Sequence, residues 1–110
     1  MRPLTFLARR FVAGDTLDEA VLQVGRLNSA GIKATLDYLG EECQAREQAA
    51  AARDEYVRML GRIAAEKLDC NVSLKLTQFG LALDGALCRD NLFRVLDEAK
   101  KSGNFVRIDM

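Results

Sequence analysis

The chain has 110 residues, a length that fits one domain, and 49% of them are apolar, enough for a modest core. Lysine plus arginine and aspartate plus glutamate number 16 each, so the net charge gives no reason to expect nucleic acid or an anionic membrane surface as a partner. No apolar run approaches the roughly 18 residues of a membrane span. We therefore expect a cytoplasmic protein without a transmembrane segment.

The three cysteines carry no sign of a disulfide framework or a zinc site. Cys43, Cys70 and Cys88 are odd in number and far apart, and the chain contains no histidine. We expect reduced cysteines without a role and no bound metal. The absence of histidine also removes the commonest general base, and with it the usual serine or cysteine triad, from this stretch of sequence.

Helical patterns recur three times along the chain. The expected helices belong to a helical lead-in over residues 1–31, to about 42–68 and to 89–102. Thr16 and Glu19 form a capping-box pattern at the start of the first helix. The second segment is rich in alanine, glutamate and arginine and has one stripe that we expect to be buried, made of Tyr56, Leu60, Ile63 and Lys67. A turn signal, Asp84-Gly85, precedes the third.

Strand patterns alternate with these helices, near 32–37, 71–76 and 104–109. Alternation of this kind builds a parallel sheet through right-handed crossovers. The glycine-rich fingerprint of dinucleotide-binding domains does not follow the first strand, which argues against a Rossmann domain.

Each predicted strand has one polar and one apolar face. The polar positions are Thr35 and Asp37 in the first strand, Ser73, Lys75 and Thr77 in the second, and Arg107 and Asp109 in the third. Apolar faces belong under the covering helices, so the polar faces all point to the opposite side of the sheet. That side is apolar in a doubly wound protein but is the lumen in a barrel. The predicted fold is therefore α/β, the first three strand-helix units of a (β/α)8 TIM-type barrel, and so a fragment.

Three charged residues lie at the carboxyl ends of these strands, where barrel enzymes assemble their sites: Asp37, Lys75 and Asp109. An ammonium fixed in a dry pocket is a good counter-ion for a substrate carboxylate, and flanking aspartates would keep it protonated. A Schiff-base nucleophile instead needs a lysine with a depressed pKa. The competing interpretation is a network of structural ion pairs that plugs the lumen.

Four short segments carry a family resemblance: Arg10-Phe11-Val12-Ala13-Gly14, Thr35-Leu36-Asp37-Tyr38-Leu39-Gly40-Glu41, Ser73-Leu74-Lys75-Leu76-Thr77-Gln78 and Val106-Arg107-Ile108-Asp109-Met110. In this order they resemble the first part of bacterial monofunctional proline dehydrogenase. The resemblance implies a flavin-containing barrel of proline catabolism. Such an enzyme oxidises L-proline to 1-pyrroline-5-carboxylate, passes hydride to non-covalently bound FAD, and passes electrons onward to a membrane quinone.

The resemblance also implies roles for individual residues. Lys75 matches the lysine that helps to bind the proline carboxylate, and Asp109 matches an aspartate of the active site, our candidate catalytic residue. Met110 follows where the family's backbone approaches the flavin, which makes it the candidate cofactor contact. Asp37 and Arg107 match motif positions to which we assign supporting, structural roles.

The family's barrel needs eight strand-helix units, whereas three are predicted here. Residues 1–110 are therefore expected to be the amino-terminal portion of a longer enzyme, inactive when isolated. The parent enzyme would reach its quinone by peripheral association with the inner membrane. Two other hypotheses remain open. One is a non-catalytic α/β interaction module that completes its sheet with another chain. The other is a fragment of a different barrel enzyme, such as a Schiff-base lyase that uses Lys75 as its amine.

Overall fold

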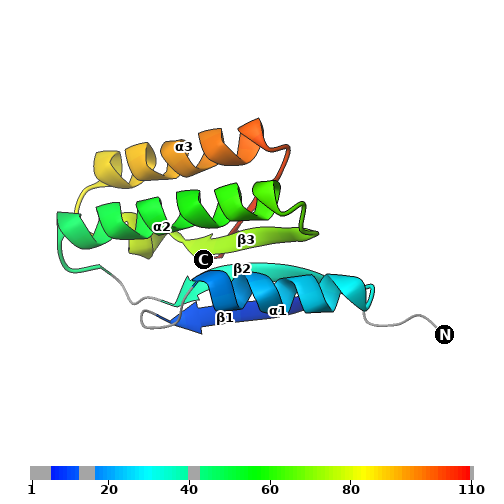
Figure 1. The fold of residues 1–110 in the computed structure, drawn as a ribbon. Helices are drawn as coiled ribbons and strands as arrows, with labels where there is room; N and C mark the ends of the chain where they lie inside the picture. The colour runs from blue at the N-terminus through cyan, green and yellow to red at the C-terminus, as the bar shows by residue number, and fades with distance from the viewer. Residues whose placement is uncertain (1–5, 13–16, 40–42, 110) are drawn as a thin grey trace.

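A computed structural model describes residues 6–12, 17–39 and 43–109 of the chain (Figure 1). Strands and helices alternate throughout this part. The elements are β1 (Phe6–Val12), α1 (Leu17–Ser29), β2 (Lys33–Leu39), α2 (Arg46–Ala65), β3 (Cys70–Lys75), the 3-10 helix η1 (Leu76–Phe79), α3 (Gly85–Lys101) and β4 (Val106–Asp109). The predicted α/β class is confirmed.

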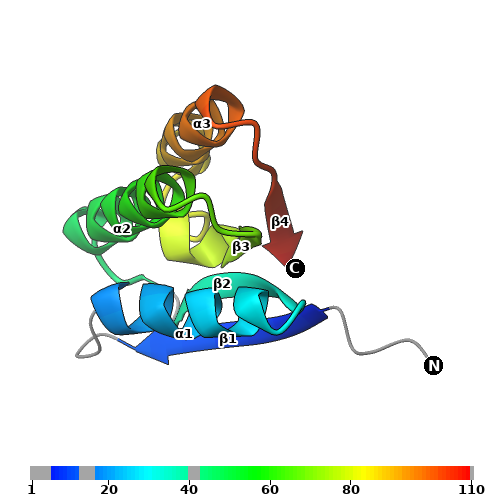
Figure 2. The ribbon, with the colours of Figure 1, turned by 45° about the vertical axis from the view of Figure 1, so that its right-hand side comes forward.

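The described strands form one parallel sheet in the order β1-β2-β3-β4. Each connection therefore moves one strand further in the same direction, and right-handed crossovers then place every connecting helix on the same face. Figure 2 shows α1 lying along β1 and β2, with α2 and α3 side by side over the rest of the sheet. A doubly wound sheet would instead reverse its strand order and use both faces.

The helical lead-in expected over residues 1–31 is wrong in its first part. Phe6–Val12 is a strand that pairs with β2 along its whole length, from Phe6 opposite Lys33 to Val12 opposite Leu39. Only Leu17–Ser29 is helical. The segment is rich in apolar and aromatic residues that suit a strand, and the neighbouring edge of β2 supplies backbone partners that no local pattern reveals. The described sheet thus has four strands, where three were predicted. Thr16, one half of the expected capping box, lies outside the described residues.

Two helix boundaries also differ from the prediction. On α2, Tyr56, Leu60 and Ile63 are buried as expected, but Lys67 lies beyond the helix with a φ of 53° and is exposed. Asp84 ends the turn between η1 and α3, since its backbone N–H donates to the Gly80 carbonyl. It is the N-cap of α3, because its side chain accepts hydrogen bonds from the backbone N–H groups that follow it. The third helix therefore begins at Gly85, earlier than predicted.

The core lies between the helices and one face of the sheet. In β3 the side chains of Cys70, Val72 and Leu74 are buried, Asn71 and Ser73 are half-buried, and Lys75 is exposed. The largest fully buried side chains are those of Tyr56, Phe79, Leu36, Met59, Leu60, Leu74, Val24, Val72 and Val95. Because the apolar face of β3 is buried under α2, the predicted division of this strand into an apolar and a polar face is confirmed.

Candidate functional site

On the polar face of the sheet, the side chain of Asn71 links three strands, although the sequence pattern did not single out this residue. The Oδ1 atom of Asn71 accepts a hydrogen bond from Thr35 Oγ1 at 3.1 Å and one from Arg107 Nε at 3.4 Å. These bonds link β2, β3 and β4 across the face that points away from the helices. Strand parity was the available signal, because Asn71 lies two residues before Ser73 and shares its face. The Arg107 guanidinium also lies 5.7 Å from the centre of the Phe105 ring.

The register of the sheet brings the predicted charged residues together near the carboxyl ends of the strands, which we call the carboxyl edge of the sheet. Lys75 pairs with Asp109 in β4, whereas Asp37 and Arg107 each pair with Ser73, one from either side. Lys75 and Asp109 are the last residues of their strands. The carboxyl ends of β3 and β4 therefore present an ammonium group beside a carboxylate, as the strand pattern predicted.

A closed pocket around Lys75 would need more strands than the four that the described residues supply. In this part of the chain Lys75 stands on an open face. Its side chain is exposed, as are those of Arg107 and Asp109, because four strands leave the polar face of the sheet open. In the part of the chain that the structure describes, no ion pair joins Lys75 to Asp109.

One further predicted position lies elsewhere, and one cannot be placed. Thr77 belongs to η1, and therefore does not continue the polar face of β3 as its parity had suggested. The chain leaves the strand after Lys75 because η1 follows at once and ends at Gly80 in the left-handed conformation. Met110, the predicted cofactor contact, lies outside the described residues.

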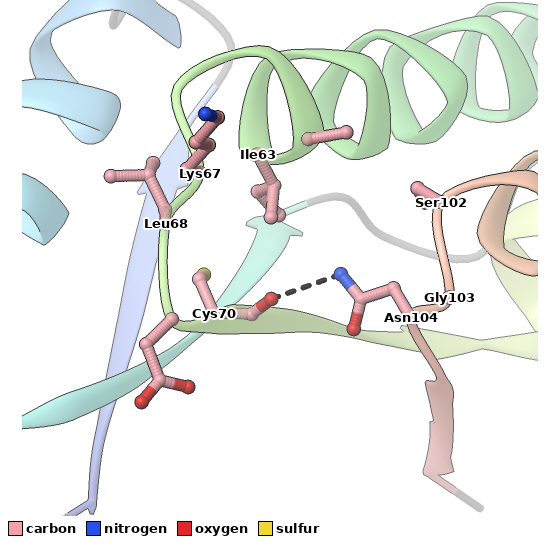
Figure 3. Close-up of a pocket in the computed structure, with 9 residues that line it drawn as sticks. Ile63, Lys67, Leu68, Cys70, Ser102, Gly103 and Asn104 are labelled. Carbon is pink, nitrogen blue, oxygen red and sulfur yellow. Dashed lines mark hydrogen bonds between the residues drawn. The ribbon is translucent and has the colours of Figure 1, made fainter.

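A cavity of about 400 Å³ opens at the other end of β3 (Figure 3). It lies between the end of α2 and the loop that leads into β4, and Asn104 Nδ2 donates a hydrogen bond to the Cys70 carbonyl across it at 3.0 Å. Burial raises the pKa of the Cys70 thiol to about 12, so this group is not a thiolate nucleophile at neutral pH. The cavity is at the amino end of the strand, so it is separate from the edge that carries Lys75.

Neither a metal site nor a membrane span is evident in the described residues. They contain no cluster of cysteine, aspartate and glutamate side chains that could hold a metal ion. None of their helices is both long enough and apolar enough to cross a bilayer.

Comparison with known proteins gives a consistent result. No protein-family model matches the chain. Among curated proteins it is 44% identical over 103 residues to "Proline dehydrogenase 1" of Bacillus subtilis (strain 168), and 33% identical over 103 residues to "Proline dehydrogenase 2" of the same strain. It is 32% identical over 107 residues to "Proline dehydrogenase" of Deinococcus radiodurans. Each match covers 94% of the chain and 34% of the relative.

These identities show what the chain is similar to. It is an α/β segment with a parallel sheet, and it is similar to proteins named proline dehydrogenase along nearly its whole length. The resemblance that rested on four short motifs is confirmed. The chain spans about a third of the length of these relatives.

Proposed function

We propose that the chain is the amino-terminal portion of an enzyme that oxidises L-proline to 1-pyrroline-5-carboxylate in proline catabolism. The observation that carries this proposal is the similarity of 94% of the chain to proteins named proline dehydrogenase, at identities from 32 to 45%. Because the chain spans about a third of their length, the activity belongs to the complete protein.

The complete protein is proposed to be a (β/α)8 barrel. Two features of the described residues support this: the strands follow one another in sequential order, and the sheet carries a polar face opposite its helices. A barrel continues such a sheet until it closes, and the polar face becomes the wall of a site at the carboxyl ends of the strands. Closure would also cover the sheet edges that β1 and β4 leave open in the described part.

The proposed substrate suits the charges at this edge. Proline is a small zwitterion with one carboxylate and one cationic amine. We assign the Lys75 ammonium to the carboxylate, because a charge-assisted hydrogen bond both binds and orients such a group. Asp109, opposite Lys75 in the register, is assigned to the active site, where it would place a carboxylate beside the lysine side chain. Arg107 and Asp37 are assigned supporting roles on the same face.

A flavin fits the donor groups on this face. The Arg107 side chain is exposed and its guanidinium carries N–H donors besides the Nε that bonds to Asn71, and flavin carbonyl and phosphate oxygens accept from such groups. When bound, FAD supplies the two-electron acceptor for the hydride that proline loses. We propose Met110 as a backbone contact to this group. Transfer of electrons to a quinone, with the complete protein associated peripherally with the inner membrane, completes the proposal.

The test is an assay of the complete protein. With FAD bound, L-proline should reduce the flavin, which bleaches its visible absorption, and a dye acceptor should then turn over. The same measurement with D-proline is the control for stereochemical binding. A folded, flavin-loaded protein that L-proline does not reduce would overturn the proposed activity.

The coding sequence provides a separate check. Further strand-helix units after Met110 would support a barrel enzyme. A stop codon at that point, together with self-association of the 110-residue chain, would favour the interaction module instead.

A further inference from the structure

The ladder between β2 and β3 stops before either strand ends. Its last pair is Asp37 with Ser73. Beyond that pair, β2 continues to Leu39 beside β1, and β3 continues to Lys75. Beyond this pair, the facing backbone N–H and C=O groups of β2 and β3 are not paired with each other in the sheet. In a protein interior such groups need other hydrogen-bond partners.

Two side chains supply these bonds. The Tyr56 hydroxyl accepts from the Tyr38 backbone N–H at 3.1 Å and donates to the Ser73 carbonyl at 2.8 Å. Gln78 Nε2 donates to the Tyr38 carbonyl at 2.7 Å, and its Oε1 accepts from the Lys75 backbone N–H at 2.9 Å. Tyr56 and Gln78 thus form a bracket between the ends of β2 and β3, and Lys75 is one of its attachment points.

The bracket is held firmly in the core. Tyr56 is fully buried and Gln78 is 5% exposed. The Tyr56 ring meets the Phe79 ring edge to face, with centroids 5.6 Å apart. Asn91 of α3 donates to the Phe79 carbonyl at 3.2 Å. The exposed ammonium of Lys75 therefore extends from a backbone that is fixed to α2 and, through η1, to α3.

We propose that Tyr56 and Gln78 are positioning residues for Lys75. By replacing the ladder, they separate the ends of β2 and β3 and set the direction in which Lys75 projects beside Asp109. The inference rests on the proposed function, because it takes Lys75 to bind the substrate carboxylate. It goes further by assigning the geometry of that contact to two buried side chains that act through the backbone of β2 and β3.

Two variants of the complete enzyme test the bracket. Tyr56→Phe keeps the ring and its contact with Phe79 but removes the hydroxyl. Gln78→Met keeps the length of the side chain but removes both polar atoms. We expect each to raise the KM for L-proline about tenfold with less than about a twofold change in kcat, because the carboxylate contact is misplaced while the oxidation step is unchanged.

A double-mutant cycle separates positioning from general destabilisation. If the bracket acts through Lys75, Gln78→Met should raise the KM no further in a Lys75→Ala background. Val95→Ala is the matched control, because it opens a cavity at a fully buried position of α3 but removes none of the hydrogen bonds of the bracket. It should lower the melting temperature and leave the KM unchanged.

Amide hydrogen exchange gives a readout that needs no activity. Gln78→Met should accelerate exchange of the Lys75 amide at least tenfold relative to that of Val72, because Gln78 is its acceptor. Unchanged relative exchange would overturn the bracket. A normal KM in both bracket variants, with Lys75→Ala raising it, would overturn positioning alone. A normal KM in Lys75→Ala would instead remove the proposed substrate contact, and the inference with it.

Discussion

Lys75 and Asp109 face each other across β3 and β4, in register and on the same side of the sheet. Neighbouring strands lie about 4.8 Å apart, so the two side chains start close enough to contact one small ligand. Each is the last residue of its strand. The pair therefore offers a positive and a negative group at the same edge, which is the complement of an amino acid zwitterion.

Replacement of Lys75 by alanine should weaken substrate binding in the complete enzyme. The variant loses the proposed counter-ion of the carboxylate, so the KM for L-proline should rise about 10- to 100-fold with a smaller change in kcat. Steady-state kinetics over a range of proline concentrations measure both constants.

Lys33→Ala is the matched control for this substitution. Lys33 is an exposed lysine at the first position of β2, the other end of the sheet, and its loss should leave the KM unchanged. An unchanged KM in Lys75→Ala would exclude Lys75 from the carboxylate site. A substrate adduct trapped on Lys75 by borohydride would instead support the lyase hypothesis.

Neutralising the facing carboxylate should be coupled to the loss of the lysine. Asp109→Asn is expected to lower kcat/KM about tenfold or more. The double variant with Lys75→Ala should lose less than the product of the two single effects, because both residues act on the same ligand. Independent, multiplicative losses in steady-state kinetics would show that the two residues contact different groups.

The edge that carries this pair was predictable from the sequence because strand geometry is strictly periodic. In β3 the alternation of side chains assigned Ser73 and Lys75 to one face, and the parallel arrangement then brought the strand ends together. The contacts that the sequence did not predict join residues that lie far apart along the chain. Gln78 bonds to the Tyr38 carbonyl from 40 positions away, and no local pattern encodes such a contact.

Two errors in the predicted fold have similar physical origins. β1 was missed because a strand with a short, mixed pattern is stabilised by pairing with β2, which is a tertiary effect. The third helix was predicted to begin at residue 89, not at Gly85, because the side-chain oxygen of Asp84 that favours turns also caps helices. Which of the two forms is decided by the packing of the segment that follows.

The cap of α3 should make stability depend on pH at the acid end. The Arg46 guanidinium, together with the backbone N–H groups of Ala86 and Leu87, holds the pKa of Asp84 below its ordinary value of 3.8. The folded state therefore favours the carboxylate. This contribution is fully present above about pH 3.8 and is lost as the pH falls through the lower folded pKa.

Asp84→Asn tests this contribution. The variant should melt a few degrees below the parent at neutral pH, and the difference should shrink below about pH 3.8. Asp97→Asn changes an exposed carboxylate of the same helix and should show no such difference. A gap between parent and Asp84→Asn that does not shrink as the pH falls below 3.8 would show that the cap does not act through its charge.

The Cys70 thiol should resist modification in the folded protein. Burial raises its pKa from 9.0 to about 12, so the reactive thiolate is scarce at pH 8 and alkylation should be slow until the protein is unfolded. Since the folded pKa is the higher one, the linked stability is full below pH 9 and declines as the pH rises toward 12. Mass spectrometry after timed alkylation measures the rate, and rapid labelling of native Cys70 at pH 8 would contradict the prediction.

Replacement of Gly80 should be costly for two reasons. Its φ is 98°, and a Cβ atom added there would lie 2.8 Å from Leu87 Cδ2. The left-handed backbone alone disfavours alanine by about 1–2 kcal/mol, and the contact adds to this. Gly80→Ala should therefore lower the free energy of unfolding by at least about 1–2 kcal/mol in a denaturant titration.

Gly61→Ala provides a control of opposite sign. Gly61 lies inside α2, and an added Cβ would meet no atom within 4 Å, so alanine should raise the free energy of unfolding by about 0.5–1 kcal/mol. Combining Gly80→Ala with Leu87→Ala separates the two causes at Gly80, because it removes the close contact and leaves the backbone conformation. If Gly80→Ala were as stable as the parent, η1 would have to end in another conformation, and the bracket that holds Lys75 would need a different geometry.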